Sequence, residues 1–270
     1  MSILKITDAE FDQLVNYMYS RYGINLSRKR ALIEGRLGMM LTQRGYTDYA
    51  SYIRDILNDK TGQEVSTLVS RLTTNFTYFL REEGHYTFLT SHVFPQWKKA
   101  PLLERRIWSA ACSSGEEPYS IAMVLYDYFG GIRPGKVAIT ASDISENVLS
   151  QARAGIYTAD QIGKLPPEWT TRFFNRQEKE RFEVKSTLKN LIQYKYFNLN
   201  DPRFWPKSHY DIIFCRNVMI YFDQPTKQAV INRLHDALRP GGFLLIGMSE
   251  TLVNLKSEFK YIQPSIYQRL

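Results

Sequence analysis

Short apolar runs alternate with helical patterns through the second half of the chain. Turn residues such as Gly130-Gly131 and Pro240-Gly241-Gly242 separate the segments. The strand-like runs are Ile107–Ala111, Val137–Ser142, Tyr210–Val218 and Phe243–Met248, and the helix-like stretches are Tyr119–Phe129, Ser145–Ala154 and Thr226–Leu238. This alternation of strands and helices predicts an α/β fold.

The first 70 residues carry apolar positions at helical spacing instead. Phe11, Leu14 and Met18 mark a first helix, for which Asp8 is the expected N-cap. The stretch Ser27–Arg44 predicts a second helix, and two short helices are expected at Tyr49–Leu57 and Glu64–Leu72. The basic residues available for the exposed side of the second helix are Arg28, Lys29, Arg36 and Arg44. They indicate either a docking face for an acidic partner or an ordinary solvated face.

Residues 156–197 interrupt the α/β alternation. Two short runs, Phe182–Val184 and Leu191–Tyr194, resemble strands and predict a small antiparallel insertion at about residues 170–197. At the end of the chain, Phe259–Ile262 and Ser265–Arg269 predict a hairpin.

The segment Arg106–Tyr119 reads as a strand, a tight loop and the start of a helix. Pro118 suits a first helical turn, and Gly115 allows the backbone to pass close to a ligand. The segment contains neither a P-loop nor a complete G-x-G-x-x-G motif. Glu116 and Glu117 stand where a phosphate site would want N–H donors, so they suit a cofactor with a cationic part, such as S-adenosylmethionine. An ordinary turn with a pair of capping acids remains the alternative.

Two further stretches offer candidate ligand contacts. Asp143 ends the second predicted strand, where nucleotide-binding α/β folds place an acid that binds ribose hydroxyls, although an Asp there also caps helices. Residues 73–86 join the helical part to the α/β part and combine polar residues with an aromatic cluster. The planar guanidinium of Arg81 is suited to hold a carboxylate. A helix cap anchored by aromatic residues is the alternative for this stretch.

Composition limits the class of protein. The 270 residues include 44% hydrophobic and 23% charged residues, which is ordinary for a globular protein, and the net charge of +8 favours an anionic partner. No apolar run has the length of a membrane span, and the N-terminus lacks a signal-peptide pattern, so a cytoplasmic protein with no membrane insertion is expected. Cys112 and Cys215 provide no disulfide framework, and the four histidines show no metal-binding spacing.

Five stretches together resemble the chemotaxis receptor methyltransferases, the CheR family. They are TTNFTYFLRE, WSAACSSGEEPYSIAM, ASDISENVLSQARAGIY, FCRNVMIYFD and LRPGGFLLIGMSET. The resemblance implies a helical N-terminal domain (1–72), a linker that contributes to the cofactor site (73–90) and a Rossmann-like class I methyltransferase domain (91–270) that holds the β-subdomain insertion. It also implies transfer of a methyl group from S-adenosylmethionine to glutamate side chains on the cytoplasmic helices of chemoreceptors, with S-adenosylhomocysteine as product. A monomer is expected.

The resemblance assigns roles to individual positions. Arg81 and Tyr221 match the positions near the reacting carboxylate. Of the acidic pair, Glu117 is favoured over Glu116 for the methionyl end, and Asp143 matches the ribose-binding acid. The remaining positions that match cofactor contacts are Asn75, Thr77 and Arg81 in the linker, Asn198 and Leu199 near the adenine, and Asn217 and Val218 after the fourth strand.

One departure from the family pattern affects the expected partner. Some members grip a peptide tethered to the receptor tail with a longer, glycine-containing loop than Asn175–Arg181, so this chain resembles the tether-independent kind. Two rival functions stay open: a non-catalytic scaffold that binds S-adenosylmethionine, and a nucleic-acid methyltransferase. The second lacks support, because no [DN]-P-P-[YF] motif or Pro-Cys pair is present, so no nucleic-acid partner is expected.

Overall fold

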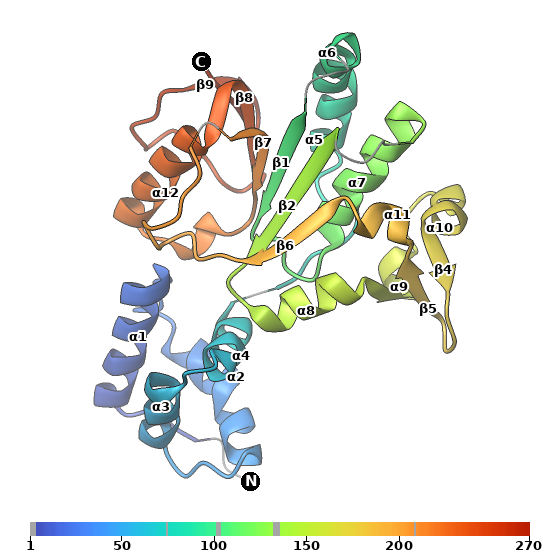
Figure 1. The fold of residues 1–270 in the computed structure, drawn as a ribbon. Helices are drawn as coiled ribbons and strands as arrows, with labels where there is room; N and C mark the ends of the chain where they lie inside the picture. The colour runs from blue at the N-terminus through green and yellow to red at the C-terminus, as the bar shows by residue number, and fades with distance from the viewer. Residues whose placement is uncertain (1–3, 74, 101–103, 132–135, 208) are drawn as a thin grey trace.

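The computed structural model describes residues 4–73, 75–100, 104–131, 136–207 and 209–270. Its N-terminal part is a group of packed helices (Figure 1). These are α1 (Asp8–Tyr22), α2 (Arg30–Gln43), α3 (Tyr49–Asn58) and α4 (Gln63–Leu72), called here the helical module. The N-cap of α1 is Thr7 and not Asp8 as expected. The Thr7 hydroxyl accepts from the Glu10 N–H, and the Glu10 carboxylate accepts from the Thr7 N–H.

The α/β part is built on a seven-stranded sheet with the order β6-β2-β1-β7-β8-β10-β9. Its strands are β1 (Arg105–Ala110), β2 (Val137–Asp143), β6 (Ile192–Tyr196), β7 (Tyr210–Cys215), β8 (Leu238–Ile246), β9 (Phe259–Gln263) and β10 (Ile266–Arg269). The first five strands in this order are parallel, whereas β10 runs antiparallel to β8 and β9. The predicted α/β fold and the terminal hairpin are therefore confirmed.

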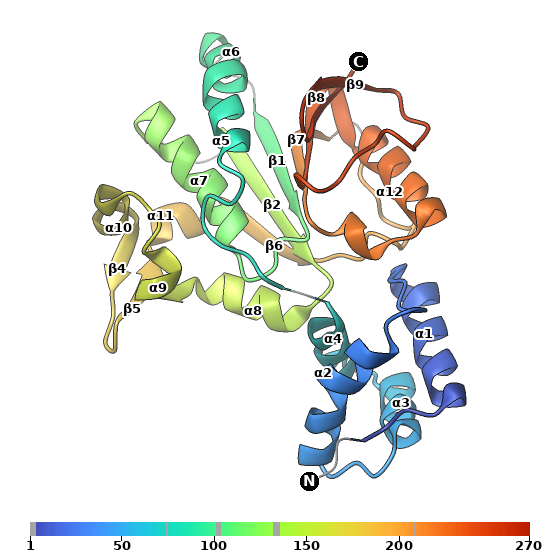
Figure 2. The ribbon, with the colours of Figure 1, turned by 180° about the vertical axis from the view of Figure 1, so that it is seen from behind.

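Successive side chains along each strand point alternately into two apolar layers, one on each face of the sheet. Ile107 and Ile212 pack with one set of helices, and Trp108 and Ile213 pack against α12 on the other face. The helices of the first layer are α5 (Gly84–Phe88), the π-helical turn η1 (Leu89–Val93), α6 (Phe94–Lys99) and α7 (Glu116–Phe129); α12 spans Gln224–Ala237 and α8 spans Glu146–Ala154. Figures 1 and 2 show α7 and α12 on opposite faces of the sheet.

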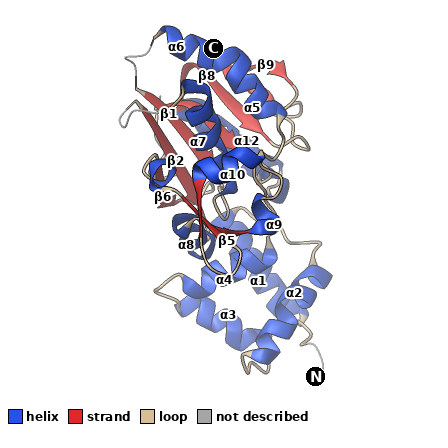
Figure 3. Cartoon of the chain, turned by 90° about the vertical axis from the view of Figure 1, so that its right-hand side faces the viewer, coloured by secondary structure: helices blue, strands red, loops and turns tan. Residues whose placement is uncertain are grey.

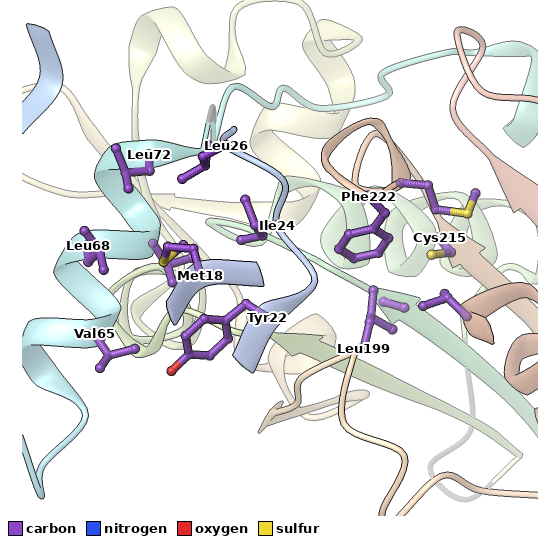
Figure 4. Packing of buried hydrophobic residues seen from close by; sticks show 14 of the residues in the cluster. Met18, Tyr22, Ile24, Leu26, Val65, Leu68, Leu72, Leu199, Cys215 and Phe222 are labelled. Carbon is purple, nitrogen blue, oxygen red and sulfur yellow. The ribbon is translucent and has the colours of Figure 1, made fainter. Parts of the chain in front are cut away.

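The apolar core of the helical module continues into the sheet domain. Met18, Tyr22 and Leu68 of the module belong to the same buried cluster as Leu199 and Phe222 (Figure 4). The bridge between Ile24 and Phe222 adds a backbone connection. The module is therefore packed against the edge of the sheet at which the parallel strands end, as it lies in Figure 1.

A small three-stranded sheet with the order β3-β5-β4 stands beside the main sheet (Figure 3). Its strands are β3 (Ile156–Thr158), β4 (Phe174–Arg176) and β5 (Arg181–Val184), and α9 (Ala159–Ile162), α10 (Pro167–Phe173) and α11 (Ser186–Lys189) surround them. The antiparallel insertion exists, but the strand predicted at Leu191–Tyr194 was wrongly assigned to it. That run forms β6, which pairs parallel with β2, because Ile192 and Tyr194 pack beside Ala141 and Leu149 of the main domain.

Candidate active site

A crevice lies between the helical module and the ends of β1, β2 and β7. At this place the chain order of the sheet reverses, which is where open α/β sheets bind ligands. The crevice is lined by every cofactor and catalytic candidate from the sequence except Gly115 and Glu116; these lining candidates are Asn75, Thr77, Arg81, Glu117, Asp143, Asn198, Leu199, Asn217, Val218 and Tyr221. The structure thus brings together residues from five separate stretches of the chain.

The loop after β1 packs closely against α8 at Gly115. Gly115 has a φ of 99°, and a Cβ atom there would lie 2.9 Å from the Cβ of Ala152 and from the hydroxyl of Tyr157. Glycine is therefore required for packing against α8 and β3. That the Gly115 backbone lies close to a ligand stays a prediction, and the structure adds a packing reason for the glycine.

The two glutamates at the start of α7 have different surroundings. The Glu116 carboxylate is buried beneath the loop and accepts a 2.7 Å hydrogen bond from the Ser114 hydroxyl. The Glu117 carboxylate lines the crevice, accepts from Ser109 Oγ at 2.6 Å and pairs with Arg216 Nη1 at 2.9 Å. Burial raises the pKa of Glu117, and Arg216 opposes that rise. Glu117 is therefore the acid available to a cationic ligand.

Asp143 closes β2 at the crevice. One carboxylate oxygen accepts from the Ser113 N–H at 2.9 Å, and the other accepts from the Ser145 N–H at 3.0 Å. Burial raises the pKa of Asp143, while these backbone hydrogen bonds favour the ionised form. The carboxylate is fixed in orientation, and its remaining lone pairs suit the hydroxyl groups of a ribose.

Arg216 is a site residue that the sequence analysis did not identify. Its side chain is 2% exposed, and it reaches Glu117 and Glu82 and donates to the backbone oxygen of Arg81. A charged residue at the end of the buried strand Tyr210–Cys215 is the signal that points to a paired group there.

Glu250 was also missed. Its carboxylate accepts the backbone N–H groups of Gly247, Asn217 and Met219 at 2.6, 2.9 and 2.8 Å, and so joins the loops after β7 and β8. This brace holds Asn217 at a φ of 57° and fixes the start of the 3₁₀ turn η2 (Met219–Tyr221), which carries Tyr221. Burial raises the pKa of Glu250, and the three N–H groups oppose the rise.

The linker residues make hydrogen bonds within the linker, to α4 and to the loop after β1. The Arg81 guanidinium donates to the backbone oxygen of Phe76 at 2.8 Å and lies over the Tyr78 ring. The side-chain amide of Asn75 donates to Ser70 Oγ at 2.9 Å, at the end of α4. The Asn75 backbone oxygen accepts from Ser113 Oγ, which ties the linker to the loop after β1.

Part of the crevice lining is apolar and comes from residues of the N-terminal part of the chain. Tyr22, Ile24 and Val69 line it together with Ile144 and Phe197. Asn198 also lines the crevice, but its side-chain amide already donates to the backbone oxygen of Arg21 and accepts from the Asn200 N–H. The apolar contribution of the module had no signal in the local sequence pattern.

The basic docking candidates do not form one helical face. Arg28 and Lys29 precede α2, which begins at Arg30. Arg36 donates to the backbone oxygens of Arg71 and Thr73, and Arg44 makes a two-armed ion pair with Glu64. The prediction of a continuous basic helix Ser27–Arg44 was therefore wrong in its N-terminal part.

Neither cysteine is exposed, and both have their pKa raised by burial. The His85 ring is buried, its Nε2 lies 2.6 Å from Ser265 Oγ, and burial lowers its pKa to about 4. Within the described part of the chain, no cluster of His, Cys, Asp and Glu is placed to hold a metal ion. Over the same residues, no helix has the length and apolar character needed to cross a membrane.

Comparison with known families agrees with this geometry. The model described as "CheR methyltransferase, all-alpha domain" matches residues 9–73, and the model described as "CheR methyltransferase, SAM binding domain" matches residues 75–267. The chain belongs to the CheR methyltransferase family. The resemblance noted in the sequence is confirmed, and this CheR-family chain is an S-adenosylmethionine-dependent methyltransferase of chemotaxis.

Full-length relatives of the CheR family are similar over almost all of the chain. A chemotaxis protein methyltransferase of Borreliella burgdorferi is 41% identical over 98% of this chain and 96% of its own length. Proteins with the same name from Escherichia coli (37% identical, 98% and 92% covered) and Vibrio parahaemolyticus (35% identical, 100% and 100% covered) are also similar.

The crevice of this CheR-family chain fits S-adenosylmethionine by its donor set. Glu117 offers an anionic oxygen to an ammonium group, and Asp143 offers oriented oxygens to ribose hydroxyls. Phe197 and Ile144 provide apolar surface of the kind that an adenine ring needs. Acidic and apolar groups therefore lie in one continuous crevice, as this cofactor requires.

Proposed function

We propose that the chain transfers the methyl group of S-adenosylmethionine to glutamate side chains on the cytoplasmic helices of chemoreceptors. The products are glutamate methyl esters and S-adenosylhomocysteine. Membership of a chemotaxis methyltransferase family supports this proposal. The observation that carries it is the crevice itself, which has carboxylates for the cofactor and both Arg81 and Tyr221 in its lining.

Roles for individual residues follow from where they lie. Glu117 binds the ammonium group of the cofactor, Asp143 binds its ribose, and Asn198 and Leu199 lie beside its adenine. Asn75, Thr77, Asn217 and Val218 complete the lining, whereas Gly115 and Glu116 act by shaping the loop beneath it. When bound, S-adenosylmethionine supplies an electrophilic methyl group on a sulfonium.

An anionic acceptor suits this site because the described lining residues include no histidine, and the Glu117 and Asp143 carboxylates are already held by Arg216 and by backbone N–H groups. A free glutamate has a pKa of about 4.3 and is already ionised near neutral pH. Arg81 orients the carboxylate, and Tyr221 forms the wall beside it. Positioning of the reacting groups then supplies most of the rate enhancement.

Residues 1–72 act in this proposal as the receptor-docking domain, with residues 73–90 as the linker. Arg28 and Lys29 are exposed at the start of α2, which suits contact with an acidic helix bundle. Arg36 and Arg44 contribute less, because internal partners already hold them. Replacing Arg28 and Lys29 by Glu should weaken receptor binding and leave S-adenosylmethionine binding intact. Unchanged receptor affinity would refute the docking role.

The β-subdomain is proposed not to require a tethering peptide. Residues 177–180 close the turn between β4 and β5, with Lys179 and Glu180 both at a φ of 55°. Methylation of a receptor truncated at its C-terminal tail should therefore proceed at the same rate as methylation of the full-length receptor. A large loss of rate with the truncated receptor would contradict this assignment.

The deciding experiment measures transfer of labelled methyl groups from S-adenosylmethionine to receptor-enriched membranes of the source organism. Base-labile label on a receptor, lost in both Arg81→Ala and Asp143→Ala, is the expected result. Cofactor binding without label on any receptor would instead favour a non-catalytic scaffold. Label on nucleic acid would identify the other rival function.

A further inference from the structure

One guanidinium group connects the cofactor-facing acid to the linker. Arg216 Nη1 lies 2.9 Å from a Glu117 oxygen, Nε lies 3.3 Å from a Glu82 oxygen, and Nη2 donates to the backbone oxygen of Arg81. These contacts join the end of β7, the start of α7 and the linker. Since Arg216 is nearly fully buried, loss of its side chain would leave Glu117 and Glu82 without their paired charge.

The linker turn held by Arg216 has an unfavourable backbone conformation. Leu80 and Glu82 both have a φ of 57°, in the left-handed region that disfavours residues other than glycine. The Leu80 N–H donates to Ser120 Oγ of α7, and Asn217 Nδ2 lies 3.4 Å from the other Glu82 oxygen. The turn that carries Arg81 therefore depends on neighbours from α7 and from the segment after β7, and Arg216 makes two of these four contacts.

Arg216 is also the cation that faces Glu117. Among the described residues, four other titratable groups interact with the Glu117 carboxylate from the loop after β1, β7, the linker and α5. These four are Cys112, Cys215, Glu82 and Tyr86, and none of them carries a positive charge. The Ser109 hydroxyl adds a neutral hydrogen bond. Burial alone would favour a protonated Glu117, and Arg216 opposes this.

We propose that Arg216 is a positioning residue that keeps Glu117 anionic and holds the Arg81–Glu82 turn, so that S-adenosylmethionine binding is insensitive to pH near neutrality. This inference rests on the proposed role of Glu117 as the partner of the cofactor's ammonium group. Without the guanidinium, Glu117 takes up a proton at a higher pH and loses its attraction for that ammonium. Affinity for the cofactor then falls on the acid side and recovers as the pH rises.

The test measures S-adenosylmethionine affinity by calorimetry at several pH values between about 6 and about 8. The variants are Arg216→Gln, which keeps polar contacts without the charge, and Arg216→Lys, which keeps the charge without the three-way geometry. Arg239→Gln is the matched control, because Arg239 pairs with Asp211 at the opposite edge of the sheet. Affinities are compared as variant-to-wild-type ratios, so the titration of the cofactor's own amino group cancels.

We expect the cofactor affinity of Arg216→Gln, relative to that of the wild type, to fall about tenfold from the alkaline to the acid end of the pH range, since one unit of pKa corresponds to a tenfold change. The affinity ratio for Arg216→Lys should not change with pH. The kcat of this variant for methyl transfer should fall at unchanged cofactor affinity, because the Arg81 turn loosens. The Arg239→Gln ratio should be flat and close to one. A flat ratio for Arg216→Gln, or a pH-dependent ratio for Arg216→Lys, would overturn the proposal.

Glu117→Gln separates failure of this inference from failure of the proposed function. If Glu117→Gln binds the cofactor as tightly as wild type, the role assigned to Glu117 is wrong and the proposal for Arg216 falls with it. If Glu117→Gln binds weakly but Arg216→Gln shows no pH dependence, only the Arg216 proposal is wrong. Should Arg216→Gln fail to fold, the pH profile and kcat of Arg216→Lys still decide the outcome.

Discussion

Charged side chains gather at both ends of the parallel strands in the main sheet, but the balance of acids and cations differs between the two ends. At the edge away from the crevice, the Asp211 carboxylate accepts the Arg106 N–H at 2.7 Å and lies 3.4 Å from both Arg105 and Arg239. At the crevice, one guanidinium, Arg216, serves two carboxylates. The first edge has cations in excess of acids, and the second has acids in excess of a cation.

This difference separates a structural cluster from a binding site. The Asp211 cluster is satisfied by the protein alone, so it contributes to stability without a ligand. Burial raises the pKa values of the carboxylates that line the crevice, Glu117 and Asp143, so the protein offsets only part of the cost of their desolvation. A cationic ligand is what lowers that cost, so the crevice is poised to bind one.

The largest test of this contrast pairs Glu117→Gln with Asp211→Asn. Removing the Glu117 charge should weaken S-adenosylmethionine binding by roughly 10- to 100-fold, because a charge-assisted hydrogen bond contributes about 1.5–3 kcal/mol. Asp211→Asn should leave this affinity within about twofold and lower the free energy of unfolding by about 1–3 kcal/mol. Calorimetry measures the affinities, and urea denaturation measures the stabilities. The contrast fails if the Asp211 variant is the one that loses the cofactor.

A second test uses two glycines of the same segment, Gly242 within β8 and Gly247 directly after its end. A Cβ at Gly247 would lie 2.6 Å from Asn217 Nδ2 and 2.8 Å from a Glu250 oxygen, whereas a Cβ at Gly242 would lie 2.8 Å from the Arg239 backbone oxygen. Gly247→Ala should therefore displace Asn217 and weaken cofactor binding about tenfold. Gly242→Ala should lower the free energy of unfolding by about 1–3 kcal/mol without that loss. Equal cofactor affinity in the two variants would argue against a role for the Glu250 brace in binding.

A third, smaller effect is expected in the dependence of stability on pH. The pKa values of Glu117 and Asp143 are raised above their ordinary values of 4.5 and 3.8, chiefly by burial. The folded protein thus holds these protons more tightly than the unfolded chain, and this contribution to stability is lost as the pH rises through the raised values. Bound S-adenosylmethionine favours ionised Glu117, so it should raise the melting temperature more at the alkaline end of that window.

Melting curves with and without the cofactor, from about pH 4.5 to about pH 8, check this effect, because groups elsewhere cancel in the difference. Glu117→Gln serves as the control and should show less change in the cofactor-induced shift with pH. A shift that is constant across the window in the wild type would count against linkage between cofactor binding and these carboxylates.

The smallest effect is expected at the exposed ion pair of the helical module. Arg44 and Glu64 are 36% and 25% exposed, in contrast to the 2% of Arg216. Arg44→Ala should therefore change the free energy of unfolding by only about 0.5 kcal/mol and cofactor affinity not at all. Thermal denaturation in low and high salt measures the change. A loss as large as that of Asp211→Asn would mean that exposure does not decide the strength of these pairs.

Local sequence patterns were sufficient for most elements but not for all contacts. Strand and helix runs, the acidic residues after β1 and β2, and the position of Arg81 could be identified because each has a signal within a few neighbouring residues. The run Leu191–Tyr194 was misassigned, since four apolar and aromatic residues do not reveal which sheet they join. Arg216 and Glu250 could not be assigned partners, because the linker and two strand ends meet only in three dimensions.

The apolar wall formed by Tyr22, Ile24 and Val69 has a thermodynamic consequence. These residues belong to residues 1–72, for which a receptor-docking role is proposed, so in this proposal the same part of the chain contacts both ligands. If receptor binding shifts the module and changes cofactor affinity by some factor, the cofactor must change receptor affinity by the same factor. Receptor binding and occupancy by the methyl donor would then be linked equilibria, and the same coupling factor could be measured by titrating either ligand.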